Sequence, residues 1–347
     1  MTTFTSGRSR VPTRRRFLGL TAGALALGLL AACGDSGPGA AAGGSSTAAA
    51  PSGPWTFTDD RGKTVSLPQR PTRIVMQVNA AATLVDFGIK PTAVFGPQKL
   101  EDGKADPQAG DVDPGVVSVG TEFGEFNLEK YTEQRPELLV TIMYGESLWY
   151  IPEESQAAIE EKAPMVAIQL GGVSAAEGIA KFAKLAESLG ADLDSAELAK
   201  AKKDFEDAGA ALKAAAAAKP GLKVEVVQGT QDALLVGKPS FFSDLKYFTE
   251  QGVDIVAPTA GEQPTWDELS WERASTYPAD LILTDARQFT LSQDELAKIP
   301  TWAQLPAVQA KQLGLWHAET PMSYQKLAPV IRELTGVIEK ARADVVS

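Results

Sequence analysis

Side chains that could bind a metal ion or act as nucleophiles are scarce in this sequence. The 347 residues include a single Cys, Cys33, and a single His, His317. One Cys forms no internal disulfide, and one His leaves no material for a His-rich zinc or manganese site. The sequence also lacks a Gly-x-Ser-x-Gly elbow, a Walker loop and a His-Glu-x-x-His motif. We therefore expect no catalytic site of the hydrolase or nucleotide-enzyme kind and no bare metal ion.

Cys33 stands at the end of an export signal. Arg14, Arg15 and Arg16 precede an uncharged run, Leu18 to Ala32, which as a helix spans about 22 Å, too short to cross a bilayer. The run ends in Leu-Ala-Ala-Cys, a pattern that looks like a bacterial lipobox. We expect residues 1–33 to be a signal peptide and the protein to be exported and lipid-anchored through Cys33 to the outer face of the cell membrane. The Arg residues favour twin-arginine export, but such a cluster also serves the general pathway.

The segment after Cys33 predicts a flexible tether. Residues 34–54 hold one charged side chain, Asp35, among Gly, Ala, Ser, Thr and Pro, so they cannot bury enough apolar area to offset the entropy of ordering.

The first 33 residues contain five of the 33 basic side chains and none of the 44 acidic ones, so the net charge of the remainder is −16, against −11 for the whole chain. An acidic body without a basic stripe predicts no nucleic-acid binding.

Two similar α/β patterns follow the tether. Arg73 to Asn79 is a β-rich run, a helical stretch reaches Phe87, and 91–96 predicts a second strand. The same order recurs in 224–229, 242–251 and 253–256.

A second repeat is sharper. Glu129 precedes the apolar run 137–141 and Glu272 precedes 280–284, both copies being 143 residues apart. We therefore expect a duplication with two similar lobes.

A long helix is predicted between the two lobes. Asp194-Ser195-Ala196-Glu197 resembles a capping box, and helix-forming residues continue to Lys219, with Leu198, Phe205 and Leu212 on one face. We predict an α/β fold of two Rossmann-like lobes with mostly parallel sheets, joined by this one helix, with a ligand cleft between the lobes. The expected boundaries are 55–190 for the first lobe, 191–220 for the linking helix and 221–347 for the second lobe.

Lipobox, tether, twin lobes and linking helix together resemble the substrate-binding proteins of ABC importers that capture iron–siderophore complexes and cobalamin. The resemblance covers roughly residues 55–345. Its landmarks are an opening hairpin, the approach to the first strand, the two short segments that contain the repeated Glu, and a helical stretch near the end; they occupy 59–65, 68–75, 127–130, 269–272 and 302–310.

The resemblance implies a partner and two docking residues. In this family one exposed Glu on each lobe docks onto Arg residues of a dimeric permease, and Glu129 and Glu272 occupy those positions. Two like-placed carboxylates suit a two-fold partner, although each Glu could also simply favour the first turn of a helix. The expected partners are an ABC permease dimer with its ATPase subunits, while the binding protein itself acts as a monomer without a cofactor.

The ligand is expected at the carboxyl ends of the strands, where open α/β sheets place their crevices. Arg287 and Tyr144 are the strongest candidates because both follow the duplicated strand. The remaining strand-end and loop candidates are mostly aromatic side chains, with a few polar ones: Asn79, Phe123, Phe126, Trp149, Gln228, Thr230, Phe242, Trp266 and Tyr324.

Charge narrows the ligand class. Residues from 55 onward contain eight Arg, mostly outside the predicted cleft, whereas a tri-anionic catecholate chelate needs several cations once desolvated. We therefore expect a ferric siderophore of the hydroxamate kind, whose chelator fills the coordination shell of the iron. Cobalamin or haem are the alternatives, with Tyr144, Tyr324 or His317 as axial ligand for haem; a surface enzyme of α/β fold is a distant one.

Overall fold

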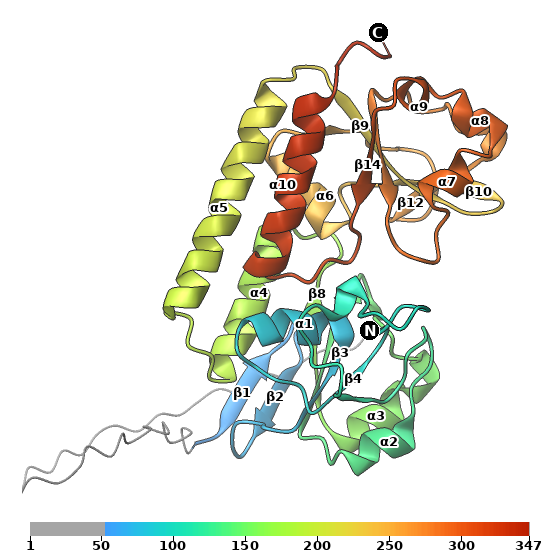
Figure 1. The fold of residues 1–347 in the computed structure, drawn as a ribbon. Coiled ribbons are helices and arrows are strands. Elements are labelled where there is room, and N and C mark those ends of the chain that lie inside the picture. Colours follow the sequence, from blue (N-terminus) through green and yellow to red (C-terminus); the bar gives the residue numbers. More distant parts are fainter. Residues whose placement is uncertain (1–52, 347) are drawn as a thin grey trace, which may run out of the picture. The chain divides into compact units, whose positions relative to one another are not determined.

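Two six-stranded sheets with helices packed on them form two lobes (Figure 1). The computed structural model describes residues 53–346, which belong to one compact unit. We call the lobe that precedes the long helix α5 (Ala196–Ala217) the N-lobe and the one that follows it the C-lobe. Within 53–346 no helix is long and apolar enough to cross a membrane. Cys33, the export signal and nearly all of the predicted tether lie outside the described residues.

The N-lobe begins with the predicted hairpin and continues into a mostly parallel sheet. Strands β1 and β2 pair with each other, and the sheet has the order β5-β4-β3-β6-β7, with β8 on β6. Only the β6–β7 pairing in this sheet is antiparallel. The strands are β1 (Trp55–Thr58), β2 (Thr64–Leu67), β3 (Ile74–Gln77), β4 (Ala93–Phe95), β5 (Val117–Ser118), β6 (Leu138–Tyr144), β7 (Ser147–Leu148) and β8 (Met165–Gln169). The helices are α1 (Val78–Asp86), η1 (Pro107–Ala109), α2 (Leu128–Glu133), η2 (Glu153–Ser155), α3 (Gln156–Lys162) and α4 (Ala175–Ser188).

The C-lobe repeats this plan with one more antiparallel pairing. Its sheet has the order β12-β10-β9-β13-β14, with β11 on β9. The pairings among β9, β11, β13 and β14 are parallel, whereas β10 is antiparallel to both of its neighbours, β9 and β12. The strands are β9 (Lys223–Gly229), β10 (Ala233–Gly237), β11 (Asp254–Ile255), β12 (Trp266–Ser270), β13 (Leu281–Asp285) and β14 (Leu313–Trp316). The helices are α6 (Ser243–Glu250), η3 (Trp271–Arg273), α7 (Gln293–Leu296), α8 (Pro300–Ala303), α9 (Pro306–Gln309) and α10 (Tyr324–Lys340).

The predicted repeat corresponds to equivalent strands. β6 in the N-lobe and β13 in the C-lobe are both buried central strands, and each pairs in parallel with the first sheet strand of its lobe, β3 or β9. The α/β fold of two lobes with mostly parallel sheets is therefore confirmed. These strands are continuous apolar runs in the sequence because other parts of the fold cover both faces of each sheet.

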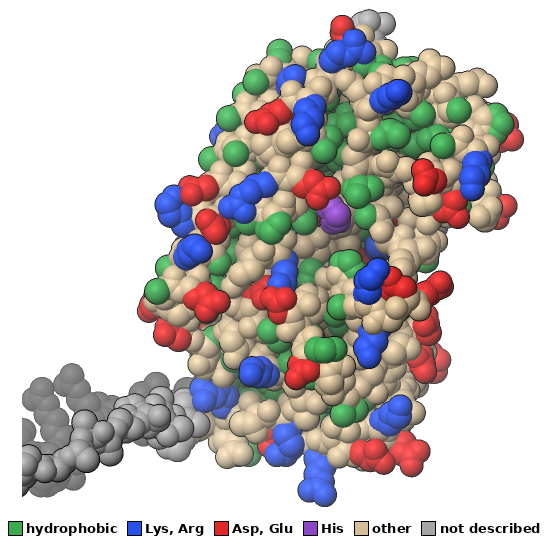
Figure 2. Space-filling model, viewed as in Figure 1, with side chains coloured by type: hydrophobic (Ala, Val, Ile, Leu, Met, Phe, Trp, Pro, Cys, Tyr) green, Lys and Arg blue, Asp and Glu red, His purple; other side chains and the backbone are tan. Residues whose placement is uncertain are grey.

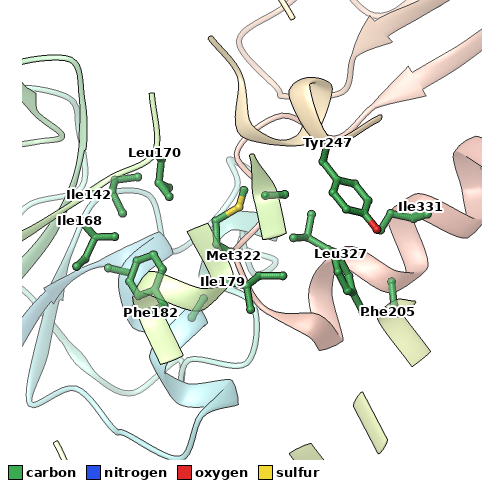
Figure 3. Packing of buried hydrophobic residues seen from close by; sticks show 14 of the residues in the cluster. Ile142, Ile168, Leu170, Ile179, Phe182, Phe205, Tyr247, Met322, Leu327 and Ile331 are labelled. Atoms are coloured by element: carbon green, nitrogen blue, oxygen red, sulfur yellow. The ribbon is translucent and has the colours of Figure 1, made fainter. Parts of the chain in front are cut away.

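The predicted linking helix is α5, and α10 packs along it (Figure 1). Leu198, Phe205 and Leu212 are buried as predicted. Figure 3 shows Phe205 beside Tyr247 and Leu327, within a buried cluster that also includes Ile142 and Ile168 of the N-lobe. The connection is thus a pair of helices in a continuous core. The sequence analysis did not anticipate α10, which contains Pro329 within its first two turns.

Candidate functional site

Aromatic rings from three C-lobe segments gather at one place. Phe242, the N-cap residue of α6, lies 4.9 Å from the ring centroid of Trp266, 5.0 Å from that of Trp316 and 5.5 Å from that of Phe241. Trp316 and Trp266 are 5.7 Å apart. Trp316 ends β14, Trp266 begins β12, and Phe241 and Phe242 directly precede α6, so three separate elements contribute these rings.

A second aromatic group stands at the end of β6 in the N-lobe. The ring of Trp149 lies 5.0 Å from that of Tyr144 and 5.1 Å from that of Phe123. Tyr144 also stacks on Phe241 of the C-lobe, with centroids 5.9 Å apart and planes 28° apart. The two groups are therefore continuous from one lobe to the other, and Phe123, 64% exposed, lies at the outer edge. We call this set of rings the aromatic cluster; its members are Phe123, Tyr144, Trp149, Tyr150, Phe241, Phe242, Trp266 and Trp316.

Arg287 borders the aromatic cluster from the loop after β13. Its guanidinium carbon lies 6.0 Å from the ring centroid of Trp316 and 4.7 Å from that of Phe289. Its Nε donates to both carboxylate oxygens of Asp285 at 3.1 and 3.0 Å, and its Nη1 lies 3.1 Å from Oε1 of Glu319. Arg287 is therefore already paired with two anions.

Burial and neighbouring charges shift the pKa of each group here. Burial lowers the pKa of Arg287, but the adjacent Glu319 and Asp285 carboxylates outweigh it and raise the pKa, so the guanidinium stays charged. Burial raises the pKa of Glu319, opposed by Arg287 and reinforced by Asp285. Burial also raises the pKa of Tyr144, with the Glu319 carboxylate adding to the effect, so its hydroxyl is neutral. Burial raises the pKa of Asp244, whose carboxylate accepts from Nε1 of Trp316 at 2.6 Å, to about 6.

Gln228, a strand-end residue as expected, contacts Arg287, and Asn79 contacts Glu319. Gln228 is in β9, and its Oε1 accepts a long hydrogen bond of 3.4 Å from Nη2 of Arg287. Asn79 follows the strand β3 as expected, and it lies in the first turn of α1, because Oε1 of Gln77 accepts from the backbone N–H groups of Asn79 and Ala80 and starts the helix at once. The Asn79 side chain donates to the backbone carbonyl of Glu319 and so joins the two lobes. The Thr230 hydroxyl donates a hydrogen bond to the backbone carbonyl of Ala233 and accepts one from its N–H, within a turn.

Two predicted ligand residues lie elsewhere in the fold. Phe126 packs between Phe95 and Tyr131, at 5.3 and 5.2 Å, on the other face of the N-lobe sheet. Tyr324 is the first residue of α10 and not a loop residue, and its ring packs on Phe87 and Phe205. An aromatic ring near the end of an element is equally suited to packing between elements, so this criterion does not separate ligand-binding residues from core residues.

The two repeated Glu residues are exposed, each in the first turn of a short helix. Glu129 lies in α2 beside a shallow surface hollow lined also by Thr132 and Glu133. Glu272 lies in η3, where backbone and Ser270 hydrogen bonds lower its pKa. Neither contacts the aromatic cluster in the described contacts.

The sequence analysis missed several residues of this region: Phe241, Asp285, Phe289, Trp316 and Glu319. The apolar alternation of 313–316 before His317 is a strand signal, and it would have placed Trp316 at a strand end beside Arg287. Glu319 gave no local signal, because its ion pair joins two separate loops.

His317 pairs with Glu333 of α10 at 2.9 Å. Within 53–346 no three His, Cys, Asp or Glu side chains are grouped so as to hold a metal ion.

Comparison with known proteins identifies the family. The family described as periplasmic binding protein matches residues 75–320. The crystal structure of DesE, a ferric-siderophore receptor protein from Streptomyces coelicolor, is 39% identical in sequence with a TM-score of 0.79, covering 84% of this chain and 99% of that one.

More distant structures share the fold. FeuA, the triscatecholate siderophore binding protein from Bacillus subtilis, is 16% identical with a TM-score of 0.60 over 83% of this chain and 99% of its own. The FhuD protein from S. pseudintermedius is 19% identical with a TM-score of 0.59 over 83% and 98%. No curated protein sequence matches this chain. The family and DesE are binding proteins, so the prediction that the chain is no enzyme is confirmed, and the chain belongs to the periplasmic binding protein family.

Proposed function

We propose that this protein captures a ferric siderophore between its two lobes and delivers it to a membrane permease of an ABC importer. The proposal is supported by the similarity to the ferric-siderophore receptor DesE along 99% of that chain. The carrying observation is the aromatic cluster, which continues from one lobe to the other and is bordered by Arg287. Aromatic faces suit a bulky organic chelate, and the chelator supplies the ligands of the iron, so the protein only has to bind the complex.

The charge of the region favours a neutral or cationic chelate of the hydroxamate kind. Arg287 is neutralised by Asp285 and Glu319, whose side chains are 0% and 12% exposed. Asp106 and Asp244 lie close enough to act on the pKa of Glu319. A tri-anionic catecholate complex would enter a region where anions outnumber cations and would have to give up its hydration there.

Haem binding is less well supported than siderophore binding. Burial raises the pKa of Tyr144 and disfavours the phenolate that would bind haem iron. Tyr324 packs among helices, and His317 pairs with Glu333. None of the three side chains stands free in the cleft as an axial ligand.

We further propose that the protein is an exported monomer anchored by a lipid on Cys33. The sequence around Cys33 supports this, and the tether that follows would let the folded part reach a permease in the same membrane. Cys33→Ser should move the protein from the membrane fraction to the soluble extracellular or periplasmic fraction. Retention of the variant in the membrane would contradict the anchor, and replacing Arg14 and Arg15 by Lys would test the twin-arginine route by blocking export.

A ligand screen by thermal shift tests the proposed function. A ferric hydroxamate present at 100 times its dissociation constant should stabilise the protein by about 2.7 kcal/mol. Ferric catecholates, cobalamin and haem are tested in parallel, each against the iron-free or metal-free ligand. The proposal fails if no ferric siderophore raises the melting temperature, and a shift with cobalamin or haem alone would reassign the ligand.

A further inference from the structure

The guanidinium of Arg287 is held by two carboxylates that come from different parts of the C-lobe. Asp285 lies two residues earlier in the chain and accepts from the backbone N–H of Arg287 at 3.0 Å as well as from Nε. Its side chain is fully buried. Asp285 therefore positions the guanidinium from its own loop.

Glu319 reaches Arg287 from another loop, between β14 and α10. Its Oε1 lies 3.1 Å from Nη1, at the opposite end of the guanidinium from Nε. The backbone of Glu319 has a φ of 59°, a left-handed conformation that is rare for residues other than Gly, Asn or Asp. Its carbonyl oxygen accepts from the Asn79 side chain of the N-lobe. The backbone of Glu319 is thus held from the N-lobe, and its carboxylate is held by Arg287 of the C-lobe.

This pairing changes what Arg287 offers to a ligand. A free guanidinium presents a fork of donors that matches an anionic oxygen pair. Here Asp285 uses Nε and Nη2, and Glu319 uses Nη1. The three side chains carry one positive and two negative charges, and the exposed fractions of 16%, 0% and 12% leave little water to screen them.

We propose that Glu319 is a specificity-determining residue that excludes anionic chelates by occupying Nη1 of Arg287 and making the group of Arg287, Asp285 and Glu319 net negative. The inference rests on the proposed function, since it concerns which ferric siderophore the cleft accepts. A neutral or cationic chelate does not compete with Glu319 for the guanidinium. A tri-anionic chelate has to displace the carboxylate or bind beside it, and both cost free energy in a largely desolvated site.

The test compares Glu319→Gln with the wild-type protein in titrations followed by tryptophan fluorescence. The probes are a ferrioxamine-type ferric hydroxamate and a ferric tris-catecholate. Gln keeps the length of the side chain and removes its charge. We expect the variant to bind the catecholate at least ten-fold more tightly than wild type does, while its affinity for the hydroxamate changes by less than that factor.

Glu333→Gln is the matched control. It removes one negative charge from α10 of the same lobe, at a side chain that pairs with His317 and not with Arg287. The control should leave the catecholate affinity unchanged. An equal gain in the control would assign the effect to net charge and overturn the role of Glu319.

A second variant provides the same test if Glu319→Gln does not fold. Glu319→Gly removes the carboxylate and fits the left-handed backbone conformation, so it should fold and show the same gain for the catecholate. The inference fails if a folded variant still binds the hydroxamate but gains nothing for the catecholate, or if wild type already binds the two chelates equally. Absence of binding of any ferric siderophore to wild type would instead overturn the proposed function.

Discussion

The ring of Tyr144, at the end of the N-lobe strand β6, stacks on the ring of Phe241 in the C-lobe at a centroid distance of 5.9 Å. Backbone and side-chain hydrogen bonds surround this contact. The N–H of Gly172 donates to the carbonyl of Phe241 at 2.8 Å, and the Ser243 hydroxyl donates to the carbonyl of Leu170 at 2.7 Å. The lobes are therefore joined both beside the aromatic cluster and along the paired helices α5 and α10.

This double connection predicts little movement of the lobes on ligand binding. Opening the cleft would break the Gly172 and Ser243 hydrogen bonds and separate the continuous core that includes Phe205 and Ile142. Small-angle scattering should give the same radius of gyration with and without ligand within the error of measurement. A large contraction with ligand would show that the lobes hinge in spite of these contacts. Figure 2 shows acidic and basic side chains interspersed on one face of the molecule, and moderate salt in the buffer screens such exposed charges from one another during the measurement.

Phe289 and Phe123 should contribute to ligand affinity. They are 69% and 64% exposed, on opposite lobes, and lie against Arg287 and Trp149 respectively. Burial of a Phe ring by a ligand is worth up to about 1.5 to 3 kcal/mol, so Phe289→Ala should weaken binding by roughly ten-fold or more. Fluorescence titration measures the affinity, and thermal denaturation should show that stability changes little.

Leu315→Ala is the control for this effect. Leu315 is also exposed, at 43%, but it lies in β14 and not among the described contacts of Arg287 or the aromatic cluster. Its removal should leave affinity unchanged. Equal losses of affinity in Leu315→Ala and Phe289→Ala would mean that the Phe289 ring does not contact the ligand.

Replacing both Glu129 and Glu272 by Ala should abolish siderophore uptake and leave ligand affinity intact. Both carboxylates are exposed, and neither touches the aromatic cluster in the described contacts. Uptake of radiolabelled iron in cells and titration of the purified variant give the two readouts. Glu133→Ala with Glu268→Ala, exposed acids near the first pair, is the control and should transport normally. Lost affinity in the first double variant would place the two Glu residues in ligand binding.

Glu225→Gln should stabilise the protein at neutral and alkaline pH. Glu225 is buried in β9, its Oε1 has no hydrogen-bond partner within the described structure, and burial raises its pKa from 4.5 to about 8. Between these two values the folded protein holds a proton that the unfolded chain releases, so the free energy of unfolding falls as the pH rises. The cost reaches on the order of 3 kcal/mol near pH 7.

Thermal denaturation at pH 5 and pH 8 checks this expectation. The melting temperature of wild type should fall more between the two values than that of Glu225→Gln. Glu268→Gln, exposed on β12 of the same lobe, should follow wild type. Parallel melting curves for wild type and Glu225→Gln would show that the Glu225 carboxylate is not protonated on folding.

Local sequence patterns were enough to predict the central strands of both lobes, the duplication and the linking helix. Apolar runs such as 138–143 and 281–284 are buried on both faces of a parallel sheet, and Leu198 and Phe205 mark one face of α5. Periodicity is a property of neighbouring residues, so it can be read without knowing the fold. The positions of Tyr144 and Arg287 at the ends of equivalent strands followed from the same repeat.

The tertiary structure alone decided which side chains meet. Glu319 neutralises Arg287 and Asn79 bonds the carbonyl of Glu319, although the three residues lie in different segments. Tyr324 and Phe126, with the same aromatic chemistry as Trp149, pack inside the fold and away from the aromatic cluster. Composition determined that the protein is acidic, but the charge that a ligand meets depends on pairings between loops, and those are set by how the strands and helices pack together.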